Sequence, residues 1–301
     1  MSIHTKAGYV AIIGKPNTGK STLINTIIGT KLSIVTPKPQ TTRKRVLGIY
    51  SDESQQIIFL DTPGLLVPRY KMHIAMMDYV DISISESDII IYLCDISRCS
   101  VGASIPSHIL KLLNVIKKSG KQIVCVLNKI DLLSDVKLSL PIIAEMTSLD
   151  LFSEIIPVSA LKKSNIDRVL DIINNNLPIS PFYYDADMLS TQPERFFVSE
   201  IIREQVFLLY GAEIPYSSEV NIIEFKERSV GKWYINVEII VEKTTQKSII
   251  IGNKGEKLKS VLEKSRKAIE EHLGVGVYLD TFVKVRPKWR NNKTYLQSYG
   301  Y

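Results

Sequence analysis

A glycine-rich motif near the amino terminus constrains this chain more than any other feature of its sequence. Residues 14–21 read G-K-P-N-T-G-K-S and fit G-x-x-x-x-G-K-[ST], between an apolar run at 9–13 and a helical stretch at 20–29. The glycines let the backbone curl so that successive N–H groups face a bound phosphate, and Lys20 adds a positive charge. The motif therefore predicts a strand, a phosphate-binding loop and a helix in direct succession.

Short apolar runs continue along the first half of the chain and alternate with helical periodicity. This alternation is typical of a mostly parallel sheet covered by helices, so we predict an α/β fold. Several polar motifs begin where an apolar run stops, and open α/β sheets bind ligands at the carboxyl edge of their strands. The strands are predicted at residues 9–13, 57–60, 89–95, 122–127 and 155–158.

A proline-containing stretch, L-P-I-S-P, breaks this pattern after a helix that ends near Asn176. The order of elements then changes to that of a small α+β domain. Helices are predicted at 195–210 and 255–273, and strands at 219–227, 233–241 and 275–285. The predicted organisation is a first domain at 1–178, a linker at 179–193 and a second domain at 194–301.

The charge of the 301-residue chain, formally +7, is unevenly distributed. Residues 243–293 contain thirteen Lys or Arg against five Asp or Glu, whereas residues 181–242 contain five against eleven. A concentrated positive charge is a feature of nucleic-acid or membrane-surface partners. Any such contact is therefore expected in the last part of the chain.

The cysteines and the amino terminus indicate a reducing compartment. Cys94, Cys99 and Cys125 form no C-x-x-C pair, and two of them lie inside predicted strands, so buried reduced thiols are expected. The first strand begins by Tyr9, which leaves no room for a signal peptide, and no apolar stretch is long enough to span a bilayer. We predict a soluble, cytoplasmic protein, and peripheral membrane attachment remains open.

Residues 61–64, D-T-P-G, follow a predicted strand and suggest a metal site beside the phosphate loop. Asp61 would lie near the metal and the Gly64 N–H near a γ-phosphate. Ser21 is expected to coordinate Mg²⁺. Thr42 lies in a polar stretch between the two motifs, where a segment can close a hydroxyl over the metal when the γ-phosphate is present. The predicted Mg²⁺ ligands are therefore Ser21, Thr42 and Asp61.

Residues 128–131, N-K-I-D, end another strand and predict recognition of guanine. The Asp131 carboxylate can accept both N–H groups of the N1 and N2 edge, whereas adenine would leave it unpaired. Residues 159–161, S-A-L, would present a backbone N–H to the guanine O6. The predicted nucleotide-binding residues are Asn17, Thr18, Gly19, Lys20, Ser21, Thr22, Asp61, Gly64, Asn128, Lys129, Asp131, Ser159, Ala160 and Leu161.

These motifs resemble the Ras-like superfamily of translation-factor-related GTPases, with one difference at the catalytic position. Leu65 follows Gly64 where Ras-type enzymes carry the glutamine that orients water. In similar GTPases an asparagine at the position of Asn17 helps to hold K⁺, which supplies positive charge to the transferring phosphoryl group. The alternative is that Asn17 only caps the loop. The predicted catalytic residues are Lys20, Asn17, Thr42 and Gly64.

The second domain contains I-I-G-N-K-G at residues 250–255, ahead of a basic helix. This arrangement resembles a KH domain, whose G-x-x-G loop clamps the backbone of single-stranded RNA. Four aromatic residues, Tyr278, Phe282, Trp289 and Tyr295, could stack bases, although strand Phe and Tyr usually belong to the core. The predicted RNA-binding residues are Ile251, Gly252, Asn253, Lys254, Gly255, Lys257, Lys259, Arg266, Lys284, Arg286 and Lys288.

The whole set of motifs resembles the Era family of GTPases over nearly the full chain. The first half contributes P-N-T-G-K-S, P-Q-T-T-R, D-T-P-G-L and N-K-I-D, and the second R-E-Q-V-F, E-I-P-Y-S, I-I-G-N-K-G and F-V-K-V-R-P-K-W. The resemblance implies a type II KH domain with an extra helix in front. It also implies binding of the single-stranded 3′ tail of small-subunit ribosomal RNA during small ribosomal subunit assembly, with peripheral inner-membrane contact on the cytoplasmic side. We predict a monomer.

Three functions remain open at this point. In the first, the chain hydrolyses GTP and the nucleotide controls its affinity for RNA, with reciprocal coupling. In the second, the chain binds GTP with negligible turnover, because Leu65 stands where the glutamine would be. In the third, the GTPase is retained but the basic helix docks on anionic lipid.

Overall fold

The computed structural model describes residues 5–102 and 105–301 and separates the chain into two units. The first unit consists of the chain up to Ser33 together with Thr42–Val67 and Met76–Thr191. The second contains Ile34–Thr41, Pro68–Ala75 and Gln192–Tyr301. This division differs from the predicted boundaries, because two short segments from the first half of the sequence belong to the second unit. The first four residues of the predicted first domain lie outside the described part.

The first unit is built on a six-stranded sheet with the order β2-β3-β1-β4-β5-β6. All neighbouring strands are parallel except the edge pair β2–β3, so the predicted α/β fold with a mostly parallel sheet is confirmed. The strands are β1 (Lys6–Ile13), β2 (Val46–Ser51), β3 (Gln55–Asp61), β4 (Ile89–Asp95), β5 (Gln122–Asn128) and β6 (Glu154–Pro157).

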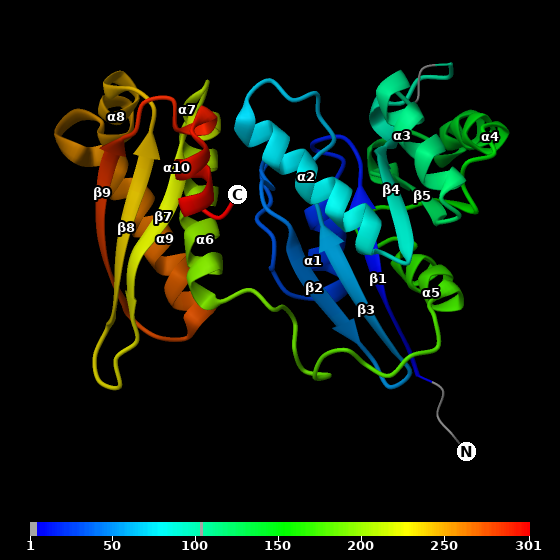
Figure 1. Ribbon diagram of the computed structural model, residues 1–301, viewed down its shortest axis with the longest axis horizontal. Coiled ribbons are helices and arrows are strands. Elements are labelled where there is room, and N and C mark those ends of the chain that lie inside the picture. Colours follow the sequence, from blue (N-terminus) through cyan, green and yellow to red (C-terminus); the bar gives the residue numbers. More distant parts are fainter. Residues whose placement is uncertain (1–4, 103–104) are drawn as a thin grey trace. The chain divides into compact units, whose positions relative to one another are not determined.

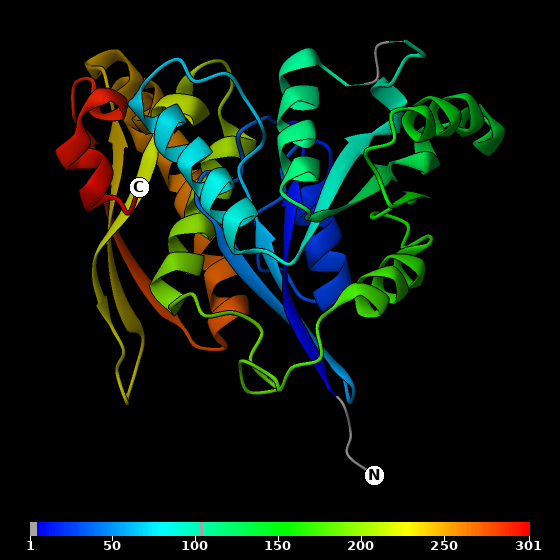
Figure 2. The ribbon, with the colours of Figure 1, turned by 45° about the vertical axis from the view of Figure 1, so that its right-hand side comes forward.

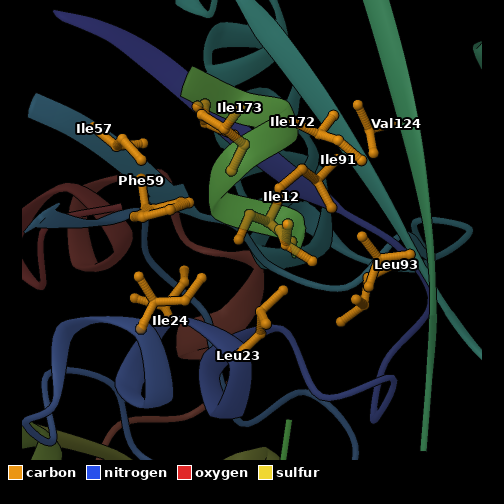
Figure 3. Close-up of a cluster of buried hydrophobic side chains, with 14 of the residues drawn as sticks. Ile12, Leu23, Ile24, Ile57, Phe59, Ile91, Leu93, Val124, Ile172 and Ile173 are labelled. Carbon is orange, nitrogen blue, oxygen red and sulfur yellow. The ribbon is translucent and has the colours of Figure 1, made fainter. Parts of the chain in front are cut away.

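Helices cover both faces of this sheet because its central strands are apolar on both faces. One core contains residues of α1 and α5 (Figure 3), and the other contains residues of α2, α3 and α4. The sheet is therefore the middle of three layers, and its carboxyl edge is left to loops. The helices are α1 (Lys20–Ile28), α2 (Lys71–Glu86), α3 (Ser107–Lys118), α4 (Leu140–Ser148) and α5 (Ile166–Asn176).

The second unit has a three-stranded sheet in which β7 and β8 are antiparallel, whereas β8 and β9 are parallel. The parallel pair needs a crossover, which α8 and α9 supply, and the G-x-x-G loop joins these two helices. Helices α6 and α9 lie side by side against the sheet (Figures 1 and 2). The elements are α6 (Glu194–Leu209), α7 (Ile214–Ser217), β7 (Glu219–Lys226), β8 (Trp233–Val241), α8 (Thr244–Ile251), α9 (Glu256–Leu273), β9 (Val277–Val285) and α10 (Lys293–Ser298).

The segment Ile34–Thr41 packs on α6 within the second unit through two basic side chains. Lys38 donates hydrogen bonds to the carbonyls of Phe207 and Tyr210, at the end of α6. The last carbonyls of a helix have no partner inside the helix and carry partial negative charge, which explains this contact. Arg203 of α6 donates to the Thr41 carbonyl and pairs with Glu200. These contacts assign the segment to the second unit.

None of the helices in the described part of the chain combines the length with the apolar sequence that crossing a bilayer requires.

Candidate nucleotide site and candidate RNA interface

The phosphate loop connects β1 to α1 at the carboxyl edge of the sheet, as the sequence predicts. Lys20 is the first residue of α1, and its ammonium group donates to the carbonyls of Gly14, at 3.3 Å, and Lys15, at 3.1 Å. Thr18 Oγ1 also donates to the Lys15 carbonyl, at 3.0 Å. These bonds hold the loop curled around its lysine, with a helix amino terminus behind it. Thr22 follows on α1 and is partly buried.

Burial lowers the pKa of the Lys20 ammonium from its ordinary value of 10.5 to about 8, although the negative charge of Asp61 opposes this shift. The folded, nucleotide-free protein therefore binds fewer protons than the unfolded chain between pH 8 and 10.5, so this group makes stability rise with pH in that window. Bound phosphates would favour the charged amine and restore its proton. Nucleotide binding and proton uptake are therefore linked at Lys20.

We predict that GDP binding takes up a fraction of a proton that is larger at pH 8.5 than at pH 7.5, because the pKa of Lys20 is lowered to about 8 before the nucleotide binds. The uptake is measured by titration calorimetry in two buffers with different ionisation enthalpies. An uptake that does not increase between these two pH values would show that Lys20 is already fully charged in the nucleotide-free protein.

Three side-chain oxygens meet beside the phosphate loop. Ser21 Oγ donates to Asp61 Oδ2 at 2.8 Å and lies 2.9 Å from Thr42 Oγ1. Thr41 does not join them, because its hydroxyl lies 2.7 Å from that of Thr36. Carboxylate and hydroxyl oxygens are the ligands that Mg²⁺ prefers, so this donor set fits the predicted metal. The structure brings together the three residues that the sequence selected as Mg²⁺ ligands.

The D-T-P-G loop packs directly on the phosphate loop. A Cβ atom added at Gly64 would lie 2.7 Å from the Pro16 nitrogen and 2.8 Å from its Cα, so only glycine allows this approach. The Leu65 N–H donates to the Gly14 carbonyl at 2.9 Å, and the Leu65 side chain is 7% exposed. Leu65 therefore belongs to the core, and its side chain has no group that could orient a water molecule.

Asn128 ties the ends of two strands to the phosphate loop. Its Nδ2 donates to the Thr18 carbonyl at 2.8 Å, and its Oδ1 accepts from the Ala160 N–H at 2.9 Å. Lys129 has a left-handed backbone conformation, with φ 70°, and its ammonium donates to the Asn17 carbonyl at 2.7 Å. Asn128 and Lys129 therefore fix the position of the loop relative to the base-recognition segment.

The remaining residues predicted to recognise guanine lie beside these contacts. Ser159 Oγ donates to Asp131 Oδ1, which orients this carboxylate. Thr26 of α1 donates to the Ala160 carbonyl at 2.9 Å. Leu161 is 71% exposed. An exposed apolar side chain beside a base-recognition segment is available to contact the face of a bound base.

Asp95 is a positioning residue that the sequence analysis missed. It ends β4, and its Oδ2 lies 2.7 Å from the Lys129 ammonium, while the Asp95 side chain is 5% exposed. This buried ion pair holds the lysine that reaches the Asn17 carbonyl. A signal was available, because Asp95 ends a predicted strand in the same way that Asp61 and Asn128 end theirs.

A cavity of about 480 Å³ opens beside the G-x-x-G loop, within the second unit. Its walls come from one side of α9 and from β9, and they combine leucine side chains with basic groups. Gly255, Lys259 and Arg266 were predicted RNA ligands and Tyr278 was a candidate for base stacking, whereas Lys232 and Leu258 were not predicted. The cavity is lined by Lys232, Gly255, Leu258, Lys259, Leu262, Glu263, Arg266, Val277, Tyr278 and Leu279.

The G-x-x-G loop adopts conformations that favour glycine. Gly252 has φ 73° and Gly255 has φ 84°. A Cβ at Gly252 would lie 2.7 Å from the Lys257 side chain, which covers this glycine. Asn253 and Lys254 are exposed at the tip of the loop, and Ile251 is partly buried before it. A ligand can therefore approach the loop backbone closely at its tip.

The predicted basic residues beyond the helix do not line this cavity. Lys284 forms an ion pair with buried Glu238 at 2.6 Å, and the Arg286 guanidinium lies 5.4 Å from the Tyr295 ring centroid. Lys288 is exposed in a turn. Arg266, which does line the cavity, pairs with Glu270 at 3.1 Å. The positive charge is therefore divided between the cavity and a separate carboxyl-terminal segment.

The aromatic candidates divide into buried and exposed residues. The suggestion that Trp289 stacks bases is wrong, because its side chain is 0% exposed and its Nε1 donates to the Ser217 carbonyl at 2.9 Å. Tyr295 stacks on Tyr299. Tyr278 and Phe282 lie on the outer side of β9, where their side chains are 59% and 42% exposed, respectively. They are therefore not core residues, unlike most Phe and Tyr residues in strands. Tyr278 is the aromatic candidate that lines the cavity.

Comparison with family models places each unit in a known class. Residues 9–129 match the family described as 50S ribosome-binding GTPase. Residues 213–290 match the KH domain.

Similar proteins cover nearly the whole chain. It is 43% identical over 299 residues to a chloroplastic GTPase ERA-like protein of Oryza sativa subsp. japonica, covering 98% of this chain and 69% of the relative. It is 41% identical over 296 residues to GTPase Era of Trichlorobacter lovleyi, covering 98% of both chains.

Two solved structures have the same fold over their full length. One is Era in complex with MgGDPNP and nucleotides 1506–1542 of 16S ribosomal RNA, with a TM-score of 0.94, 39% identity and 99% coverage of both chains. The other is an Aquifex aeolicus Era variant bound to GDP and AlF4⁻, with a TM-score of 0.93, 39% identity and coverage of 98% of this chain and 99% of that one.

Proposed function

This chain belongs to the Era family of GTPases, and we propose that it hydrolyses GTP to GDP and phosphate in order to control its binding of small-subunit ribosomal RNA. The observation that supports this most is the meeting of three predicted features at one sheet edge: the phosphate loop, the oxygens of Ser21, Thr42 and Asp61, and the Asn128–Asp131 segment. Together they match the three parts of GTP, which are its phosphates, its metal and its base.

In this proposal each group of the chain has one task. Lys20 and the loop N–H groups bind the β- and γ-phosphates, and the Gly64 N–H orients the γ-phosphate. Ser21, Thr42 and Asp61 would hold Mg²⁺, which neutralises phosphate charge when bound. Asp131 accepts from guanine, and Ser159, Ala160 and Leu161 border the base.

We also propose that K⁺ stimulates hydrolysis through Asn17. No glutamine follows Gly64 to orient the attacking water, so we expect hydrolysis to depend more on stabilisation of the transition-state charge by a cation. The backbone of Asn17 has φ 64° and is held by Lys129, so this residue stays at the edge of the phosphate loop. A monovalent cation beside it would stabilise charge that spreads over the transferring phosphoryl group.

The test is steady-state hydrolysis of GTP and ATP in K⁺ and in Na⁺, with and without single-stranded RNA that matches the small-subunit 3′ tail. We expect turnover of GTP only, faster in K⁺ and faster with the RNA. Equal rates of GTP hydrolysis in K⁺ and Na⁺ would contradict the proposal that Asn17 helps to hold K⁺. GTP binding without turnover under every condition would leave a nucleotide-gated RNA binder.

The RNA-binding part of the proposal rests on the cavity beside the G-x-x-G loop. Leucine side chains and Tyr278 offer apolar surface for bases, while Lys232, Lys259 and Arg266 offer charge for phosphates. The solved relative that holds 16S ribosomal RNA shares this fold. We assign contacts to the remaining predicted residues, Ile251, Gly252, Asn253, Lys254, Gly255, Lys257, Lys284, Arg286 and Lys288, as part of the same proposal.

Lys259→Glu is expected to weaken binding to the same extent for RNAs of different sequence, because a phosphate contact is replaced by repulsion. A plot of the logarithm of the association constant against the logarithm of the salt concentration should become less steep, by about 1 or more. Lys264→Glu is the matched control, because Lys264 is exposed on the same helix but does not line the cavity. Fluorescence anisotropy with labelled RNA at four salt concentrations measures the affinity and its salt dependence for both variants. Equal losses of RNA affinity in the two variants would mean that the RNA contacts a diffuse basic surface and not the cavity.

Adjacent residues support a coupling between the nucleotide and the second unit. The Thr41 carbonyl accepts from Arg203 of α6, whereas the hydroxyl of the next residue, Thr42, lies beside Ser21. We propose that a Mg²⁺-bound nucleotide, by fixing Thr42, acts on the segment that packs on α6. RNA must then change nucleotide affinity by the same factor that nucleotide changes RNA affinity.

The chain is proposed to act as a cytoplasmic monomer in assembly of the small ribosomal subunit. The alternative of lipid docking rests on the same positive charge of residues 243–293. Flotation with anionic liposomes in competition with the RNA separates the two. If the protein binds liposomes and the RNA does not displace it from them, then the protein contacts the membrane through a surface other than its RNA-binding surface.

A further inference from the structure

Two cysteines lie next to each other at the edge of the nucleotide site. Cys94 is near the end of β4, and Cys99 follows a short 3₁₀ helix, η1 (Ile96–Arg98), so that the chain returns on itself. Their sulfur atoms are 3.2 Å apart, and both thiols are free. Disulfide sulfurs lie about 2.05 Å apart, so closing the bond needs a movement of about 1 Å. The fold therefore presents a preformed dithiol.

The two thiols are not equivalent. The hydrogen bond between the two sulfurs lowers the pKa of Cys99, and the positive charge of Lys15 acts in the same direction, whereas burial and the Asp95 carboxylate oppose this shift. The same hydrogen bond, together with burial, raises the pKa of Cys94. Cys99 is half-buried, whereas Cys94 is 6% exposed within the core. An accessible sulfur with thiolate character beside a buried thiol is the arrangement of an attacking and a resolving cysteine.

Asp95 lies inside the ring that a bond between these sulfurs would close. Its carboxylate holds the Lys129 ammonium at 2.7 Å, and that ammonium also donates to the Asn17 carbonyl of the phosphate loop. The Cys99 thiol lies 3.4 Å from the Asp95 carbonyl. A bond between the sulfurs would remove this hydrogen bond and displace the turn that carries Asp95. Oxidation is thus connected to the nucleotide site through one ion pair.

We propose that Cys94 and Cys99 form a redox-modification site at which a peroxide produces a disulfide and thereby weakens guanine-nucleotide binding. This inference rests on the proposed nucleotide site. The Cys99 thiolate attacks the peroxide and becomes a sulfenic acid as the O–O bond breaks. The Cys94 sulfur then displaces the hydroxyl group and loses its proton. Overall, two thiols and one hydrogen peroxide give one disulfide and two waters, and the sulfurs lose two electrons.

Other functions for the pair agree less well with the structure. Among the described residues no group of three or more His, Cys, Asp or Glu side chains could hold a metal ion, so a metal centre is not indicated. Cys125 is fully buried and its pKa is raised by burial, so it is not the reactive thiol.

The experiment treats the full chain with hydrogen peroxide, maps disulfides by mass spectrometry and measures the Kd of a fluorescent GDP analogue before and after. A Cys94–Cys99 disulfide is expected, with a Kd roughly tenfold higher, as the loss of one charge-assisted hydrogen bond would give. Dithiothreitol should restore the original Kd.

Two variants complete the experiment. Cys99→Ser should bind the analogue as the reduced protein does and lose the response to peroxide, while Cys125→Ala should keep the response. Absence of the disulfide, or a disulfide with an unchanged Kd, would overturn the inference. Failure of the reduced protein to bind any guanine nucleotide would instead overturn the proposed function, and disulfide mapping would still report on the cysteines.

Discussion

Asp131→Asn is expected to lower the affinity for GDP by about a hundredfold to ten-thousandfold, because two hydrogen bonds to a charged acceptor are lost and one N–H of the base meets another donor. The same change should improve binding of XDP. Xanthine carries a carbonyl where guanine carries the N2 amine, and the new amide can donate to it. The ratio of the GDP and XDP dissociation constants is therefore expected to reverse.

Asp135→Asn is the matched control, because Asp135 is an exposed aspartate four residues further on whose side chain caps a short helix. It removes the same charge and should leave the ratio unchanged. Competition of unlabelled GDP, XDP and ADP against a fluorescent analogue measures all three proteins. A wild-type ratio in the Asp131 variant would mean that the Asp131 carboxylate does not contact the base.

Gly19→Ala should abolish measurable nucleotide binding, a loss of at least about a hundredfold, because it disrupts the bond between the phosphate loop and Asn128. Gly19 has φ 98°, and a Cβ there would lie 2.3 Å from Asn128 Nδ2. Asn128 would have to give up its hydrogen bonds to Thr18 and Ala160. Together with the left-handed backbone, this should cost about 2–4 kcal/mol of unfolding free energy.

Gly29→Ala is the control that tests the effect of a left-handed backbone conformation without a steric collision. Gly29 ends the same helix with φ 80°, but a Cβ there would meet nothing within 4 Å. It should lose about 1 kcal/mol of unfolding free energy from the left-handed conformation alone and keep its affinity for GDP. Urea denaturation and nucleotide binding are measured together. If the two variants lost affinity equally, the contact with Asn128 would not matter.

The sequence allowed the arrangement of the candidate nucleotide-site residues to be predicted because their motifs are short and continuous. Each motif lies at the end of a strand, and parallel strands end at one edge, so Ser21, Asp61 and Asn128 could be brought together without coordinates. Strand β2 was not predicted. It is short and contains Gly48, where a Cβ would lie 2.4 Å from the Ile28 side chain, so close helix packing rather than strand propensity determines that residue.

The second unit was less predictable because its ligand surface depends on tertiary packing. Tyr278 and Trp289 both follow the same pattern of aromatic residues near basic ones, yet one is 59% exposed and the other 0%. Lys232, the residue before β8, reaches the cavity because β8 pairs with β9, a contact between residues far apart in the sequence. Propensity and charge counts contain no such information.

The parallel pairing of β8 with β9 has a consequence for how the protein is made. Every strand of the first sheet, and every predicted nucleotide contact, is complete once residue 161 has been synthesised. The cavity, by contrast, needs residues 277–279, which join their sheet only after the whole crossover of α8 and α9 exists. Domains generally fold in order during translation. The nascent chain is therefore expected to bind guanine nucleotide before it can bind RNA.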